Sequence, residues 1–77
     1  MNSFNERITI DPNICNGKPT FKGKRIAVQT VLDFLAAGDS IDDILTAYPS
    51  LEEADIKAVL ELASKMMGTH FTVKSVA

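Results

Sequence analysis

Residues 28–51, with the sequence VQTVLDFLAAGDSIDDILTAYPSL, decide the fold, because apolar residues recur there every three or four positions. This spacing predicts a first helix that begins at Val28. Gly38 is expected to end it, since glycine readily adopts the left-handed conformation found after helices. The apolar stripe of this helix consists of Val28, Val31, Leu32 and Leu35.

A second helix is predicted directly after this glycine. Ser40 can cap the backbone amides ahead of Ile41, and two aspartates follow at the positive end of the helix dipole. Pro49 cannot continue the helix, so we expect it to end at Tyr48. Its apolar stripe consists of Ile41, Ile44, Leu45 and Tyr48.

A third, longer helix is predicted from Leu51 to residue 67, because Ser50 and Glu53 have the spacing of a capping box and Gly68 supplies a stop. It carries two adjacent apolar stripes, which are wider than two short helices and a thin arm would cover. It is therefore either the central core helix or part of a subunit or partner interface. The candidate interface residues are Ile8, Ile10, Leu51, Leu62 and Met66.

Residues 8–27 are predicted to form an extended arm. Ile8-Thr9-Ile10 alternates like a strand, turn residues follow at positions 11–12 and 16–17, and Arg25-Ile26-Ala27 can form a second extended piece. In the tail, residues 68–77, Phe71-Thr72-Val73 alternates again and can add an edge strand beside residues 8–10 or reach a second protomer.

The charges are segregated along the 77 residues, which form one predicted domain, 1–77, with a three-helix unit at 28–67. Residues 1–30 carry five cations and two anions, a charge of +3. Residues 31–63 carry one cation and eight anions, a charge of −7. Such asymmetry indicates binding partners, although solvated faces also show it.

Composition narrows the class of protein. A single cysteine, Cys15, excludes an internal disulfide and fits a reducing cytoplasm. No apolar run is long enough to span a bilayer, so we expect no membrane association. Cys15 lies in the arm and His70 in the tail, so a catalytic dyad would need unusual folding, and the two are too few for a four-ligand metal site. We therefore expect no enzyme activity, no metal site and no cofactor.

Nucleic-acid binding is a stronger candidate, because a short and a long helix joined by a tight turn are typical of a helix-turn-helix. The leading end of the third helix, however, carries Glu52, Glu53 and Asp55, which phosphates would repel. Any DNA contacts are therefore expected from a flexible arm or ribbon. Its candidate DNA-binding residues are Lys18, Lys22, Lys24 and Arg25.

Protein binding is the third class. An extended arm can add to a sheet edge of another chain, and an apolar helix face can dock in a groove. The sequence predicts both the extended arm and the apolar helix face, and it does not distinguish a protein partner from a DNA partner.

The motifs of the arm and helices resemble the family called domain of unknown function four-three-three, over roughly residues 7 to 63. They occur in the order ITIDP (8–12), ICNGKP (14–19), GKRIAV (23–28), SIDDIL (40–45) and YPSL (48–51). Lys24 stands where the family usually has Thr, and Ala27 where Pro is frequent. The first departure adds to the basic cluster, and the second leaves the entry to the first helix less rigid.

This resemblance implies a mainly α-helical, homeodomain-like three-helix bundle with a short-stranded N-terminal arm. It also implies an antitoxin encoded beside a nuclease-like toxin of the PIN type. We therefore expect a cytoplasmic, homodimeric antitoxin that binds a nearby-encoded toxin and also its own promoter DNA. The alternatives are a stand-alone DNA-binding regulator and a purely structural interaction module.

Overall fold

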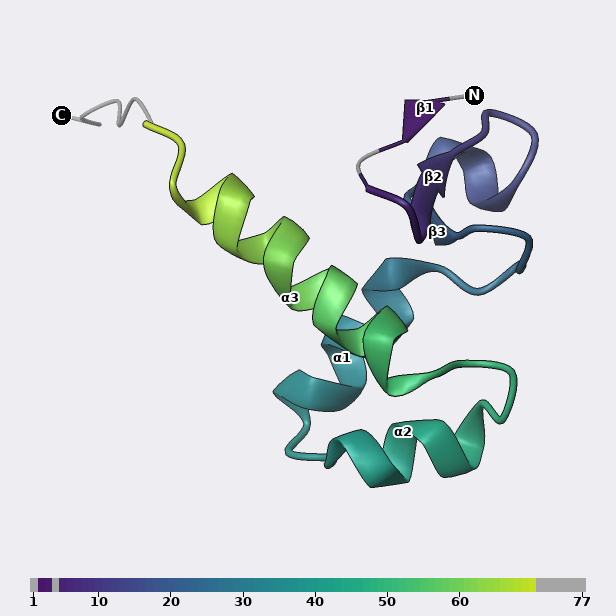
Figure 1. Ribbon diagram of the computed structural model, residues 1–77, viewed down its shortest axis with the longest axis vertical. Coiled ribbons are helices and arrows are strands. Elements are labelled where there is room, and N and C mark those ends of the chain that lie inside the picture. Colours follow the sequence, from purple (N-terminus) through teal and green to yellow (C-terminus); the bar gives the residue numbers. More distant parts are fainter. Residues whose placement is uncertain (1, 4, 71–77) are drawn as a thin grey trace, which may run out of the picture.

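The computed structural model describes residues 2–3 and 5–70, which form a mainly helical chain with a small antiparallel sheet at its N-terminus (Figure 1). Three helices were predicted, and three are present in this part of the chain. The elements in order are β1 (Asn2–Ser3), β2 (Ile8–Ile10), the 3-10 helix η1 (Cys15–Gly17), β3 (Thr20–Phe21), α1 (Val28–Ala36), α2 (Ile41–Ala47) and α3 (Glu53–Met67).

The predicted strand at residues 8–10 is β2, the central strand of the sheet, whose order is β1-β2-β3. Ile8 lies opposite Phe21 and Thr9 opposite Thr20, both in antiparallel register. The tail strand predicted at residues 71–73 lies outside the described residues. Both edges of β2 are already paired, so a further strand beside it has no free edge.

The predicted second extended piece at residues 25–27 is also present. The N–H of Phe21 donates to the carbonyl of Ile26 at 3.2 Å, and Thr20 forms an isolated antiparallel bridge with Ala27. The turn between these pieces places Gly23 at a φ of 75°. Glycine suits this position because it has no Cβ to clash in the left-handed region.

The caps of the first two helices are as predicted. Gly38 follows α1 with a φ of 94°, which is the left-handed stop expected there. At α2, the N–H of Asp43 donates to Ser40 Oγ at 3.1 Å, and the N–H of Ser40 donates to Asp43 Oδ2 at 3.0 Å. The end of α2 at Ala47 comes one residue before the predicted end.

The predicted start of the third helix is wrong by two residues. We expected a capping box from Ser50 to Glu53, but α3 begins at Glu53 and its N-cap is Glu52. Asp55 Oδ2 accepts the Glu52 N–H at 2.8 Å, and the Leu51 side chain is buried ahead of the helix. Burial of Leu51 therefore fixes the path of the chain that leads into α3. The carboxylate of Asp55, instead of Ser50, caps the N-terminal end of this helix.

The sheet is part of the hydrophobic core. Ile8 of β2 and Phe21 of β3 are almost fully buried together with Val31, Ile44 and Val59 from the three helices. Each such side chain contributes about 1.5–3 kcal/mol through burial. Of the two forms expected for this segment, a flexible arm or a ribbon, the described residues form a ribbon, because two of its apolar side chains are anchored in the core.

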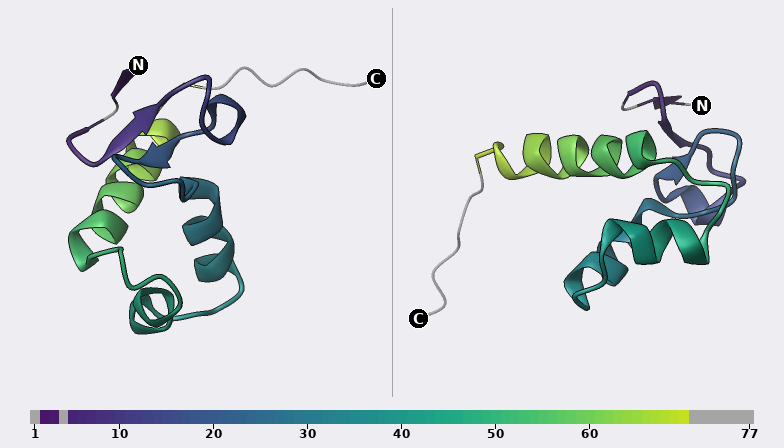
Figure 2. Two further views of the ribbon diagram at one scale, coloured as in Figure 1. Left: turned by 90° about the vertical axis from the view of Figure 1, so that its right-hand side faces the viewer. Right: turned by 60° about the horizontal axis from the view of Figure 1, so that its bottom comes forward.

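The three helices contact one another in pairs, and α3 extends beyond the other two (Figure 2). Its C-terminal end projects past the rest of the helical body, while α2 lies at the opposite end of the molecule from the sheet. In residues 2–3 and 5–70, no helix combines the length and apolar character needed to cross a bilayer.

Candidate functional site

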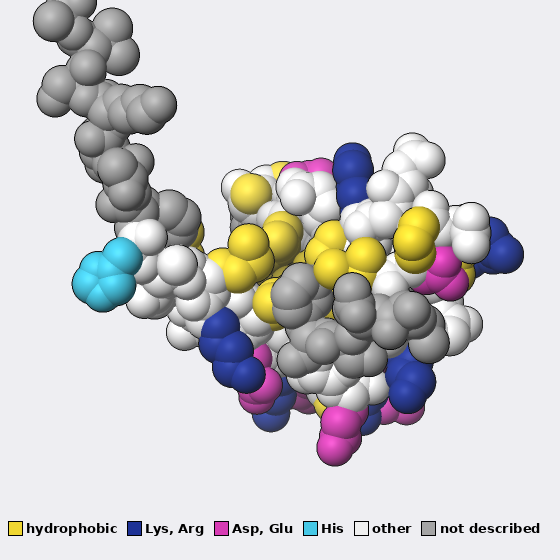
Figure 3. Space-filling model, turned by 90° about the horizontal axis from the view of Figure 1, so that it is seen from above, with side chains coloured by type: hydrophobic (Ala, Val, Ile, Leu, Met, Phe, Trp, Pro, Cys, Tyr) yellow, Lys and Arg dark blue, Asp and Glu magenta, His cyan; other side chains and the backbone are white. Residues whose placement is uncertain are grey.

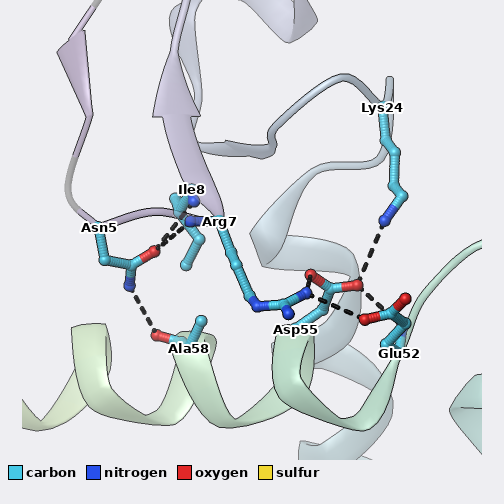
Figure 4. Close-up of polar contacts among 7 residues, drawn as sticks. All are labelled: Asn5, Arg7, Ile8, Lys24, Glu52, Asp55 and Ala58. Atoms are coloured by element: carbon cyan, nitrogen blue, oxygen red, sulfur yellow. Dashed lines mark hydrogen bonds and ion pairs between the residues drawn. The ribbon is translucent and has the colours of Figure 1, made fainter.

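A buried carboxylate, Asp55, joins the basic arm to the acidic third helix (Figure 4). Its side chain is only 3% exposed. Arg7 Nη1 donates to Asp55 Oδ1 at 3.0 Å, and Lys24 Nζ donates to Asp55 Oδ2 at 3.3 Å. The same Arg7 nitrogen lies 3.3 Å from Glu52 Oε2. The charges that the sequence separates along the chain are thus partly paired with each other inside one molecule.

The electrostatics of this cluster favour the ionised carboxylate. Burial by itself would raise the pKa of Asp55, but hydrogen bonds from the Glu52 N–H, Arg7 and Lys24 outweigh burial and lower it. The pKa of Arg7 is raised, chiefly by its hydrogen bond to Asp55. A carboxylate with a lowered pKa and fixed donors has no proton to exchange near neutral pH. The cluster therefore holds the chain together and is not arranged for acid-base chemistry.

Asn5 ties the arm to α3 at a second point. Its side-chain oxygen accepts the N–H groups of Arg7 and Ile8 at 2.9 and 3.0 Å, and its Nδ2 donates to the Ala58 carbonyl at 3.4 Å. Asn5 thereby closes the turn that leads into β2 and fixes Arg7 over the first turns of α3 (Figure 4).

The four cations predicted to contact DNA do not form one patch. Lys18, Lys22 and Arg25 are exposed and form no ion pair within the described residues, whereas Lys24 is bound to Asp55. Lys22 and Lys24 border a hollow beside Asp55, and Lys18 borders a different, apolar groove. Three of the four are thus available to an external partner.

The five predicted interface residues do not lie together on one surface. Ile8 and Leu51 are buried in the core of the chain itself, with 0% and 5% of their surface exposed. Ile10 is half-buried in β2. Leu62 and Met66 lie on the wall of the apolar groove, with 7% and 58% of their surface exposed.

This groove, which we call the α1/α3 groove, has a volume of about 320 Å³ and lies between α1, α3 and the loop before β3. All of its lining residues except a lysine and a glutamine are apolar. They are Lys18, Pro19, Val28, Gln29, Leu32, Val59, Leu62, Ala63 and Met66. Hydrophobic side chains gather in a band that runs across the molecule from the end of α3 (Figure 3).

The groove exists because α3 is longer than the helices beneath it. Val59 and Leu62 on the core-facing side of α3 are buried, but the same side continues to Met66, beyond the cover that α1 provides. An apolar helix face that remains partly exposed because no other element covers it is a common feature of binding surfaces. It matches the prediction of a broad apolar face on the third helix.

A second hollow, of about 240 Å³, lies on the other flank of Leu62 and Met66 and is also lined by Asn5, Lys65 and Thr69. The two side chains thus form a ridge between two depressions. Lys18 and Lys65 are the charged residues that line these depressions, and both are exposed.

Sequence reasoning missed Arg7 and Asn5. Arg7 was counted only in the charge balance, although it directly precedes the strand predicted at residues 8–10, where a side chain can reach a neighbouring helix. The partnership between residues 7 and 55 is a tertiary contact over 48 positions, which no local pattern reveals. Lys18 was assigned to DNA but lies at the groove, because η1 and Pro19 turn the chain toward α1.

The chain belongs to the family described as "Protein of unknown function (DUF433)", whose model matches residues 8–63. It is similar to the uncharacterized protein y4eO of Sinorhizobium fredii (strain NBRC 101917 / NGR234), with 38% identity over 52 residues. The alignment covers 68% of this chain and 24% of that protein, so the chain spans about a quarter of the relative's length. No solved structure matches the chain significantly.

Proposed function

We propose that this protein is an antitoxin-like interaction module that binds a partner protein through the α1/α3 groove. The observation that carries the proposal is the groove itself. It joins buried Leu62 to exposed Met66, and all of its lining residues except Met66 lie within residues 8–63, which the family model matches. An apolar groove on a small helical domain suits protein recognition by a docked apolar segment.

The proposed partner is a nuclease-like toxin of the PIN type encoded beside the gene. The support for this partner is the resemblance of the arm and helix motifs to a family with antitoxin members. The proposed protein works in the cytoplasm as a homodimer and has no enzymatic activity of its own. Inhibition would follow from binding, because a docked domain can block a nuclease without chemistry.

The arrangement of α2 and α3 supports the further proposal of a homeodomain-like helix-turn-helix, with a short helix, a turn at residues 48–52 and a longer helix. Insertion of the leading end of α3 into a DNA groove has little support. The arm packs over that end through Arg7 and Lys24, and Asp55 is buried. The remaining exposed charges there are Glu53, which pairs with Lys57, and Glu52.

Promoter binding is the second candidate function, favoured by the exposure of Lys22 and Arg25 without ion pairs in the described part of the chain. With Lys18, three phosphate contacts per chain would give a salt slope of about −2.7, or about −5.4 for a dimer. A stand-alone regulator or a purely structural module would use the same surfaces without a toxin.

Co-expression with the neighbouring gene tests the main proposal. The toxin alone is expected to arrest growth, and co-expression of this protein is expected to restore growth and to yield a complex that copurifies. A neighbour that is harmless, or one that neither binds nor is relieved, would contradict the antitoxin assignment.

A further inference from the structure

We infer that the occupant of the α1/α3 groove is an amphipathic helix of the partner with acidic residues beside its apolar stripe. This inference rests on the proposal that the groove is the partner-binding site, and it adds the chemistry of the segment that the groove receives.

The shape of the groove favours a helix. Val28 and Leu32 are four residues apart on α1, and Leu62 and Met66 are four residues apart on α3, and all four line the groove. Side chains at i and i+4 form ridges along a helix, and the ridges of a third helix pack into the space between two such rows. The groove thus offers the kind of surface that helix-in-groove recognition uses.

An extended strand fits this groove less well. Strand addition needs unpaired backbone N–H and C=O groups at a sheet edge. The walls of this groove are α1 and α3, whose backbone groups are paired within each helix, and the Val28 N–H at the start of α1 donates to the Pro19 carbonyl at 2.9 Å. Recognition there depends on side chains.

The charges around the groove favour an acidic partner. Lys18 lines the groove and Lys65 lines the adjoining hollow, and no aspartate or glutamate lines either depression among the described residues. The nearby Asp33 accepts a hydrogen bond at 2.9 Å from the groove residue Gln29; it keeps its negative charge but does not line the groove. A chain with a net charge of −2 thus presents lysines beside its apolar groove. Complementary rim charges chiefly set specificity and association rate.

The test uses two designed peptides of about 18 residues, long enough to form helix on binding. Both carry leucines at i, i+3, i+4 and i+7; one has Glu at every flanking position and the other has Lys. Binding is followed by fluorescence anisotropy at low and moderate salt. The acidic peptide is expected to bind at least about tenfold more tightly than the basic peptide, because like charges across an interface are penalised.

A double variant, Lys18→Glu with Lys65→Glu, is expected to reverse this preference. The matched control, Lys22→Glu with Arg25→Glu, changes the net charge equally at exposed residues that line neither depression, and it is expected to keep the preference for the acidic peptide. Circular dichroism of each variant verifies that the fold is retained.

Equal binding of the two peptides, binding of neither, or a preference that the groove variant leaves unchanged would overturn the inference. So would a concentration-dependent dimer in which a second copy blocks the peptide. Should the acidic peptide bind as expected while the neighbouring toxin does not copurify, the antitoxin proposal fails and the inference stands. Should the toxin copurify while the peptides show no charge preference, the inference fails and the antitoxin proposal stands.

Discussion

Arg7 Nη1 lies 3.0 Å from Asp55 Oδ1, so a cation directly before β2 is paired with a buried carboxylate in the first turn of the last helix. This contact spans 48 positions and fixes the arm onto α3. Together with the Lys24 contact on the other carboxylate oxygen, it explains why the N-terminal segment packs as part of the core.

Replacement of Asp55 with Asn is expected to lower the free energy of unfolding by about 2 kcal/mol, because Arg7 and Lys24 lose their anion. Loss of one partner of a fully buried pair costs about 3–5 kcal/mol, and the partial exposure of both cations reduces that cost here. Urea denaturation measures the change. The control is Glu53→Gln, which removes an exposed carboxylate from the same helical turn and is expected to cost less than about 0.5 kcal/mol.

Stability is expected to fall with acid. The pKa of Asp55 is lower in the folded chain than its ordinary value of 3.8, so its contribution is fully present above that value. It is lost as the pH falls through the folded pKa. Denaturation curves from pH 6 to pH 2 should therefore show a steeper loss in the parent than in Asp55→Asn. Asp43, whose pKa the Ser40 backbone N–H also lowers, accounts for part of the remaining slope. Parallel curves for the two proteins would contradict this assignment.

The two lysines that flank Gly23 are expected to differ in role. Lys24→Ala should lower the melting temperature, because it removes a partner of Asp55, and Lys22→Ala should leave it nearly unchanged. In gel shifts on the native upstream DNA, Lys22→Ala with Arg25→Ala should weaken any binding, and each lost contact should reduce the salt slope by about 0.9. Unchanged DNA affinity in this variant would show that the arm is not the DNA-binding surface.

Two glycines provide a matched test of backbone geometry. Gly38 has a φ of 94° with open space around it, so Gly38→Ala should destabilise the chain by about 1–2 kcal/mol through backbone strain alone. Gly68 has a φ of −77°, where a Cβ makes only ordinary contacts, so Gly68→Ala should be neutral or slightly stabilising. Thermal unfolding of both variants compares them, and an equal effect at the two sites would contradict the left-handed cap at Gly38.

The helices could be predicted from the sequence because their signals are local. Gly38, Ser40 and Pro49 each determine the backbone within a few residues, and the apolar stripes report which side of each helix is buried. The third helix was placed too early because Ser50 has the right spacing for a cap. The burial of Leu51 and the carboxylate of Asp55, both tertiary features, favoured a later start.

The candidate site could be predicted only in part. The long apolar face of α3 indicated a surface containing Leu62 and Met66, and both line the groove. Ile8 and Leu51 were equally suitable candidates for an interface in the sequence, because a pattern of apolar residues does not distinguish burial within a chain from burial between chains. The segregation of charges along the sequence predicted a charged partner. Arg7 and Lys24, however, form ion pairs with Asp55 inside the same chain.

The most direct test of the account compares two adjacent methionines in binding to the neighbouring toxin. Met66 lines the groove, whereas Met67 is 71% exposed and does not line it. By titration calorimetry, Met66→Asp is expected to weaken the affinity for the toxin by at least about tenfold, since it places a charge in an apolar groove. Met67→Asp is expected to bind like the parent. Equal affinity for the two variants, or a greater loss at Met67, would contradict the groove as the partner-binding site.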